Sequence, residues 1–144
     1  MQNVRKIDAN WPGEKSYPGG RYSLIVNLRG GEVKERSGIK FRSEVLFDIR
    51  NKRAIFEGGR LAEDVVLKNG KKWIKYKAGE QIYFDEGGKV GSGVIAEEVM
   101  MNSIKWELGS LLSFGKRGEL VTARPKNNKT INKKHYGKNT NIRQ

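Results

Sequence analysis

The chain of 144 residues contains no cysteine and a single histidine, His135. The absence of cysteine excludes disulfide bonds and thiolate zinc sites and leaves the redox compartment open. One histidine, placed near the C-terminus, excludes a Ser/His/Asp triad on the rest of the chain. Three pairs of carboxylates are adjacent in the sequence, and neighbours on a strand point to opposite faces and rarely chelate one ion. They are Glu63-Asp64, Asp85-Glu86 and Glu97-Glu98. We therefore expect a non-enzyme with no metal site and no cofactor.

Long apolar runs are also absent. No stretch approaches the roughly 20 apolar residues that span a bilayer, so we expect no membrane partner. Residues 1–6 lead into no apolar segment, which argues against a secretory signal and favours a cytoplasmic location. No Gly-x-x-x-x-Gly-Lys-Ser/Thr loop for nucleotide phosphates occurs anywhere.

Negative charge is scarce. The chain has 29 Lys and Arg against 16 Asp and Glu, a net charge of +13. Such an excess attracts polyanions, so RNA or another polyanion is the expected partner, with a protein partner as the alternative. After residue 115 the only acid is Glu119, and this basic segment supplies further candidate RNA contacts. They are Lys126, Lys129, Lys133, Lys134 and Lys138.

What the sequence does contain is period-two alternation of apolar and polar residues, broken by Gly and Asn, which predicts antiparallel strands. Alternation from Phe41 to Ile49 places Phe47 inward and Asp48 outward. The pair Asn69-Gly70 predicts a two-residue hairpin turn in which both positions have positive φ. No internal repeat is apparent. The expected strands cover residues 21–28, 41–49, 54–56, 63–67, 72–76, 80–84 and 93–99.

The period changes near residue 99. Met100, Ile104 and Leu108 recur at helical spacing, which predicts an amphipathic helix packed over one end of the β-structure. The Lys- and Asn-rich segment beyond it has too few apolar residues to fold by itself. We expect an N-terminal arm (1–20), a β-barrel (21–98), a helix (99–114) and a basic, flexible tail (115–144).

Residues 82–95 carry the most informative pattern. An apolar strand runs into Asp-Glu-Gly-Gly-Lys, and a Gly-x-Gly step leads into a second apolar strand. This pattern resembles the last hairpin in the third domain of elongation factor Tu, and the resemblance extends over roughly residues 21–98. It implies a small antiparallel β-barrel of the translation-factor type, closed by pairing of the first strand (22–28) with the last (93–99).

The same resemblance implies a set of RNA contacts. The segment Phe41-Arg-Ser-Glu-Val-Leu-Phe47 is similar to a family strand that touches transfer RNA, which points to Arg42. In the family the Glu-Gly-Gly turn also touches RNA, and glycines let backbone amides approach a phosphate closely. The implied residues of this turn are Glu86, Gly87, Gly88 and Lys89.

A second candidate surface follows from alternation alone. Trp73 and Lys75 fall on one face of a strand, opposite Ile74 and Tyr76. An exposed Trp beside lysines can stack a base while the lysines hold its phosphate. Alternatively, Trp73 lies against a hydrophobic cluster beneath lysine stems.

These observations predict a non-catalytic protein that binds RNA, in particular structured RNA such as transfer or ribosomal RNA. One alternative is a protein-interaction module that mimics a translation-factor domain, in a phage, toxin or immunity context. Another is a structural component of a larger assembly. Fold-level resemblance does not choose among them.

Overall fold

The computed structural model describes residues 3–8 and 20–126, and these residues form strands and turns with no helix. The all-β class expected from the alternation is confirmed. The strands are β1 (Asn3–Asp8), β2 (Tyr22–Asn27), β3 (Val33–Arg36), β4 (Ile39–Arg50), β5 (Arg53–Leu61), β6 (Val65–Asn69), β7 (Lys72–Tyr76), β8 (Gln81–Phe84), β9 (Val90–Val94), β10 (Val99–Met101), β11 (Ile104–Trp106), β12 (Leu111–Phe114) and β13 (Leu120–Arg124).

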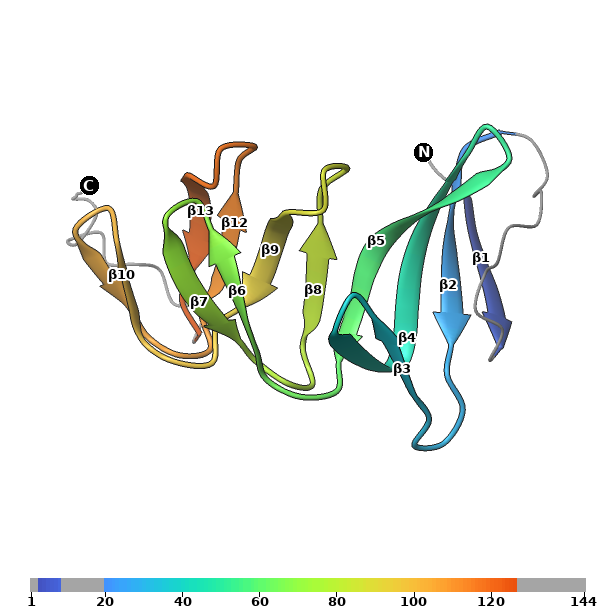
Figure 1. Cartoon of the computed structure of the whole chain (residues 1–144), viewed down its shortest axis with the longest axis horizontal. Coiled ribbons are helices and arrows are strands. Elements are labelled where there is room, and N and C mark those ends of the chain that lie inside the picture. Colours follow the sequence, from blue (N-terminus) through green and yellow to red (C-terminus); the bar gives the residue numbers. More distant parts are fainter. Residues whose placement is uncertain (1–2, 9–19, 127–144) are drawn as a thin grey trace.

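One large sheet runs along the molecule in the order β1-β2-β4-β5-β8-β9-β12-β13, and β3 pairs with β4 off this path. All its pairs are antiparallel except β1 with β2, which is parallel. The hairpins β6–β7 and β10–β11 form two separate small sheets. Figure 1 shows the turns β4–β5, β8–β9 and β12–β13 along one edge of the molecule, at the top of the view.

The sheet does not close into a barrel, so the expected pairing of the first and last strands is wrong. β2 pairs with β1 and β4, whereas β9 pairs with β8 and β12. Each new strand adds to the free edge left by the one before it, so β1 and β13 end the sheet among the described residues. The short hairpins cover one face of the open sheet, and the core is enclosed between them and the sheet.

The structure contains an internal repeat that we did not expect from the sequence. Each repeat starts at a buried aliphatic residue and continues with a short hairpin, a strand, an edge turn and a second strand. The starting residues are Leu28, Leu61 and Ile95, whose backbone amides donate to the carbonyls of Ser43, Glu80 and Ser110 at 2.7, 3.0 and 3.0 Å respectively.

The second and third repeats match in further detail. The amides of Gly79 and Gly109 donate to the carbonyls of Leu61 and Ile95, both at 2.8 Å. Both glycines have positive φ, 83° and 91°, where a side chain would be strained. Sheet pairing makes Val45, Ile82 and Leu112 equivalent, and all three are fully buried. The chain is therefore a short repeat array in which each unit packs on its neighbours.

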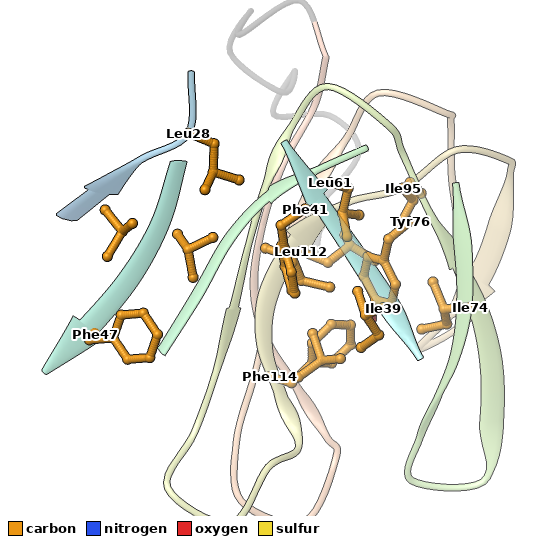
Figure 2. Close-up of a cluster of buried hydrophobic side chains, with 14 of the residues drawn as sticks. Leu28, Ile39, Phe41, Phe47, Leu61, Ile74, Tyr76, Ile95, Leu112 and Phe114 are labelled. Atoms are coloured by element: carbon orange, nitrogen blue, oxygen red, sulfur yellow. The ribbon is translucent and has the colours of Figure 1, made fainter. Parts of the chain in front are cut away.

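The core lies between the short hairpins and the sheet, as Figure 2 shows. Phe41 and Tyr76, from the first two hairpins, lie over glycines of the sheet. A Cβ added to Gly59 would lie 3.0 Å from a Phe41 ring atom, and one added to Gly93 would lie 2.8 Å from a Tyr76 ring atom. The glycines of these sheet strands therefore make room for the aromatic residue of each hairpin.

The helix expected over residues 99–114 is wrong, because this segment forms β10, β11 and β12. Asn102 and Ser103 both have positive φ, 54° and 65°, and form the two-residue turn between β10 and β11. Met100 and Leu108, expected to be buried, are about half exposed. Their helix-like spacing arises from separate strands interrupted by turns.

Two expected segments beside the barrel also contain strands. β1 lies in the expected N-terminal arm and pairs with β2. Residues 115–126, expected to belong to the tail, form the turn after β12, then β13 and the two residues beyond it. The remainder of the expected tail lies outside the described residues.

Candidate nucleic-acid interface

The second hairpin is longer than its counterparts in the other repeats. In the first and third, the turn residues Ser37–Gly38 and Asn102–Ser103 directly precede the first inward-facing isoleucine, Ile39 or Ile104. The second hairpin has six residues in place of these two, Lys-Asn-Gly-Lys-Lys-Trp at positions 68–73. They add two strand pairs, Lys68 with Trp73 and Asn69 with Lys72.

Trp73 is exposed on the outer face of this extension. Ile74 and Tyr76 are buried in the core, which confirms the alternation predicted for this strand and leaves Trp73 63% exposed. Lys68 is paired with Trp73 on the neighbouring strand β6, and its ammonium lies 5.9 Å from the centre of the Trp73 ring. Lys75, two residues along the same strand, lies 3.9 Å from a Glu97 carboxylate oxygen. This exposure argues against the alternative, in which Trp73 lies against a hydrophobic cluster beneath lysine stems.

The extension is held in place at its tip. The Tyr76 hydroxyl donates a hydrogen bond to the side-chain oxygen of Asn69, and both residues are buried. Asn69 pairs with Lys72, so the turn residues are Gly70 and Lys71, one position later than expected from the sequence. Gly70, with φ of 62°, packs on Gly118 of the β12–β13 turn, where an added Cβ would lie 2.5 Å from the Gly70 nitrogen.

Basic side chains gather where these turns meet. Lys116 and Arg117 are exposed in the β12–β13 turn against which the hairpin tip packs. Lys89, from the β8–β9 turn, donates through Nζ to the Lys116 carbonyl at 3.2 Å. The hairpin itself carries five lysines and no acid between residues 65 and 77. Basic side chains of the β8–β9 and β12–β13 turns therefore lie near the tip of the Trp73 hairpin, which carries lysines of its own.

The β8–β9 turn uses its own backbone groups, which bears on the expected phosphate contacts. The Asp85 carboxylate accepts from the amides of Gly87 and Lys89, both at 2.9 Å, and the Gly88 amide donates to the Asp85 carbonyl at 3.0 Å. Residues 115–119 form a similar turn in the next repeat. The glycine amides are thus committed to turn formation.

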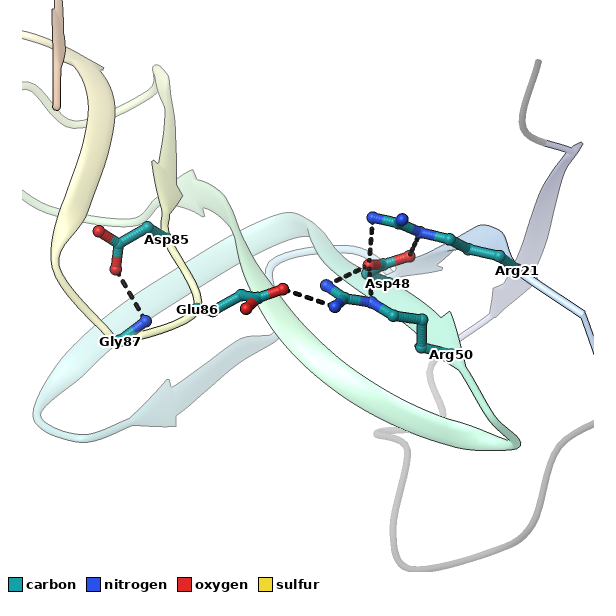
Figure 3. Close-up of polar contacts among 6 residues, drawn as sticks. All are labelled: Arg21, Asp48, Arg50, Asp85, Glu86 and Gly87. Atoms are coloured by element: carbon teal, nitrogen blue, oxygen red, sulfur yellow. Dashed lines mark hydrogen bonds and ion pairs between the residues drawn. The ribbon is translucent and has the colours of Figure 1, made fainter. Parts of the chain in front are cut away.

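Glu86 has a structural partner as well. Its carboxylate lies 2.5 Å from Arg50, which also binds Asp48, and Asp48 binds Arg21 at 3.2 Å (Figure 3). Hydrogen bonding to Glu86, and then to Asp48, raises the pKa of Arg50. Asp48 was expected to face outward, yet its side chain is only 2% exposed. This network links the β8–β9 turn to the first repeat.

A groove of about 630 Å³ lies between this turn and β5. Its lining includes the apolar residues Phe56 and Phe84 and the basic residues Arg50, Lys89 and Lys116. Glu57 also lines it; burial, with a smaller contribution from the charge of Asp48, raises the pKa of this carboxyl. Acidic residues in the lining, Glu57, Asp85 and Glu86, make the groove less favourable for a phosphate than the Trp73 face.

The remaining expected contacts are scattered. Arg42 is exposed on β4, opposite Val33 of β3, on a different hairpin from Trp73. Lys126 is exposed after β13. The other four lysines of the expected tail, Lys129, Lys133, Lys134 and Lys138, lie outside the described residues.

The described part of the chain holds no group of three His, Asp or Glu side chains that could bind a metal ion, and none of its segments is a helix long and apolar enough to cross a membrane. Residues 20–126 have 21 Lys and Arg against 14 Asp and Glu, a net charge of +7. Comparison with known proteins gave no match to any family, to any curated protein or to any solved structure.

Proposed function

We propose that this protein binds RNA without catalysing a reaction, and that the extended β6–β7 hairpin is its principal contact surface. The observation that carries the proposal is Trp73, exposed between Lys68 and Lys75. An aromatic ring on a basic β-surface stacks an unpaired base while neighbouring ammonium groups contact the backbone phosphates.

The repeat supports a functional role for these residues. The first and third hairpins complete their core packing with a two-residue turn, so the fold does not require residues 68–73. Because the Trp73 side chain is 63% exposed, it gains little from burial, and core packing does not account for its presence. The extension is therefore best explained by a ligand that contacts Trp73.

The shape of the surface favours structured RNA with unpaired loops. The strand β7 and the tip contact with Gly118 fix the position of Trp73, and a fixed aromatic platform suits bases that are already splayed out of a helix. Loops of transfer or ribosomal RNA present such bases. In this proposal Lys71, Lys116 and Arg117 contact the phosphates of an adjoining stem, and the C-terminal lysines add charge.

The turn at residues 85–89 has a smaller part in this proposal than the resemblance to elongation factor Tu implies. Its glycine amides bond within the turn and Glu86 pairs with Arg50, which leaves Lys89 as its contribution to the basic surface. Arg42 remains a peripheral candidate contact.

The test compares Trp73→Ala with Val66→Ala, because Val66 is exposed on the same hairpin face but has no aromatic ring. Binding to a fluorescent stem–loop RNA and to a loop-free duplex of equal length is measured by anisotropy at low salt. Loss of one stacked base costs roughly 1–3 kcal/mol, so Trp73→Ala should weaken stem–loop binding about 5- to 150-fold. Val66→Ala should have little effect, and duplex binding should change little in either variant.

Equal stem–loop affinity in wild type and Trp73→Ala would reject the hairpin as the contact surface. If the wild-type protein bound neither RNA at low salt, RNA binding itself would be rejected, and a protein partner for the same face would be favoured.

A further inference from the structure

The last described strand, β13, has a free edge. β5 and β9, its counterparts in the preceding repeats, are each paired on both sides, whereas β13 ends the sheet order and pairs with β12. Val121 on this strand is 60% exposed. An unprotected edge strand invites pairing with another strand.

A groove of about 360 Å³ lies beside this edge, lined by Ile104, Trp106 and the β13 residues Leu120 to Ala123. Trp106 is the counterpart of Phe41 and Tyr76. Its side chain is 9% exposed, and its buried indole N–H has no acceptor among the described residues. A buried donor without an acceptor is unfavourable, so this end of the sheet lacks a polar neighbour.

The sequence beyond β13 matches the repeat that would come next. Ala123 pairs with Leu112 in the third repeat as Gly93 pairs with Ile82 in the second, so Ala123 is the counterpart of Gly93. This pairing fixes the shift between the repeats at 30 residues. The segment 127–144 has three large apolar residues, and all three fall on packed positions of the previous repeat. Ile131 corresponds to Met101, Tyr136 to Trp106 and Ile142 to Leu112.

Two further features agree with this register. Asn139 corresponds to Gly109, which has φ of 91°, and Asn is among the residues that best tolerate positive φ. The same shift places Gln144 at the position of Phe114, the last residue of β12.

We propose that the free edge of β13 and the groove beside Trp106 are the docking surface for residues 127–144 of the same chain, which supply a fourth, partial repeat. Docking pairs the β13 edge, covers the groove and brings polar groups to the Trp106 indole. The register departs from the repeat pattern at three positions, where Pro125, Lys129 and Lys134 replace Ile95, Val99 and Ile104 of the third repeat. Because proline has no N–H, Pro125 cannot donate the hydrogen bond that the Ile95 amide donates to the Ser110 carbonyl.

The register gives a direct test, because the chain has no cysteine of its own. Ser92 pairs with Ser113 and Val94 with Leu111 in the preceding repeat. The 30-residue shift therefore places Arg143 directly opposite Thr122, which is exposed. Asn141 is then offset by two positions from Thr122. Directly opposed residues are within disulfide reach, whereas pairs offset by two are roughly 7–8 Å apart.

The full-length double variant Thr122→Cys with Arg143→Cys should form an intramolecular disulfide in a glutathione buffer. The control, Thr122→Cys with Asn141→Cys, differs by two positions in the same segment and should be oxidised at least about tenfold less at equilibrium. Non-reducing mass analysis separates intramolecular from intermolecular bonds. The experiment does not depend on RNA binding.

Equal oxidation of the two pairs would show that the segment has no fixed register on β13 and would overturn the proposal. Disulfide-linked dimers in place of the intramolecular bond would also overturn it, since they would assign the edge to a second copy of the chain. A second measurement, amide hydrogen exchange of β13, should show protected amides on the side away from β12 in the full-length protein. Substituting Tyr136→Ser with Ile142→Ser should remove that protection.

Discussion

At the scale of single residues, Asp48 holds the least expected position. Its carboxylate is buried between Arg21 and Arg50, with contacts of 3.2 and 2.9 Å. Neutralising this buried carboxylate removes the ion pair with Arg21 and leaves Arg50 paired with Glu86 alone. We expect Asp48→Asn to lower the free energy of unfolding by about 1–3 kcal/mol in urea titrations, less than for a fully buried pair because both arginines are partly exposed.

Arg21→Gln is the matched control for Asp48, since Arg50 still pairs with the carboxylate in that variant. It should cost less than about 1 kcal/mol. Equal stability of Asp48→Asn and wild type would contradict a stabilising role for this network.

Glu57 gives a pH-dependent prediction. Burial raises the pKa of its carboxyl, so the folded chain binds this proton more tightly than the unfolded chain does. The resulting loss of stability is absent at pH values below the pKa of Glu57 in the unfolded chain. It is fully present at pH values above the raised pKa of the folded chain. Glu57→Gln should therefore raise the free energy of unfolding at pH 7 by less than about 1 kcal/mol, and the gain should vanish near pH 4. A gain that persisted at pH 4 would exclude protonation as its cause.

The outward orientation of the Trp73 and Lys75 side chains could be predicted from the sequence, because alternation within one strand is a local property. The burial of Asp48 could not, because it depends on Arg21, which lies 27 residues away in sequence. Alternation assigns Asp48 to the outer face, and only the network around it explains how a charge is accommodated there.

At the scale of elements, the hairpins decide both the fold and the candidate site. The β6–β7 extension can be replaced by the Asn-Ser turn of the β10–β11 hairpin, joining Leu67 directly to Asn-Ser-Ile74. Tyr76→Phe is included so that no hydroxyl is left buried without Asn69. We expect this variant to unfold cooperatively, yet to lose stem–loop RNA binding by at least about tenfold.

The same replacement removes three lysines, so the slope of log affinity against log salt should fall by up to about 2–3 units. Tyr76→Phe alone, with the extension intact, is the control and should bind RNA as wild type does. Unchanged affinity in the shortened chain would place the RNA contact elsewhere on the molecule.

The contact between the hairpin tip and the β12–β13 turn can be tested with two glycines of equal conformation. Gly88 and Gly118 have φ of 85° and 82°, but an added Cβ meets open space at Gly88 and the Gly70 backbone at Gly118. Gly88→Ala should destabilise by about 1 kcal/mol through backbone strain alone, and Gly118→Ala by roughly 2–3 kcal/mol. Equal denaturation midpoints for the two variants would show that the tip is not packed on this turn.

At the scale of the whole molecule, the all-β class and most strand positions could be predicted, whereas the open sheet and its repeat could not. The starting residues Leu28, Leu61 and Ile95 are spaced 33 and 34 residues apart, close to constant. However, the β6–β7 hairpin is four residues longer than the β10–β11 hairpin. In addition, the link from Phe41 to Val45 is two residues shorter than the link from Tyr76 to Ile82. These compensating length changes hide the period until strand pairing is known.

The charge of the whole chain leads to a further prediction. Changing Lys129, Lys133, Lys134 and Lys138 together to Gln removes up to four phosphate contacts, so the salt slope should fall by up to about 3–4 units. Stem–loop affinity should fall at low salt while unfolding is unchanged. Unaltered slope and affinity would exclude these lysines from the RNA surface.

The order of strands in the sheet also has a mechanical consequence. Neighbouring strands lie side by side along the long axis of the molecule, with β1 and β13 at opposite ends of the order. A force applied between these ends loads the hydrogen bonds of one strand pair at a time, as when a zipper opens, and never a whole ladder in shear. Stretched in this way, the protein should yield at low force and in steps, each releasing one repeat of about 30 residues, or roughly 100 Å of chain.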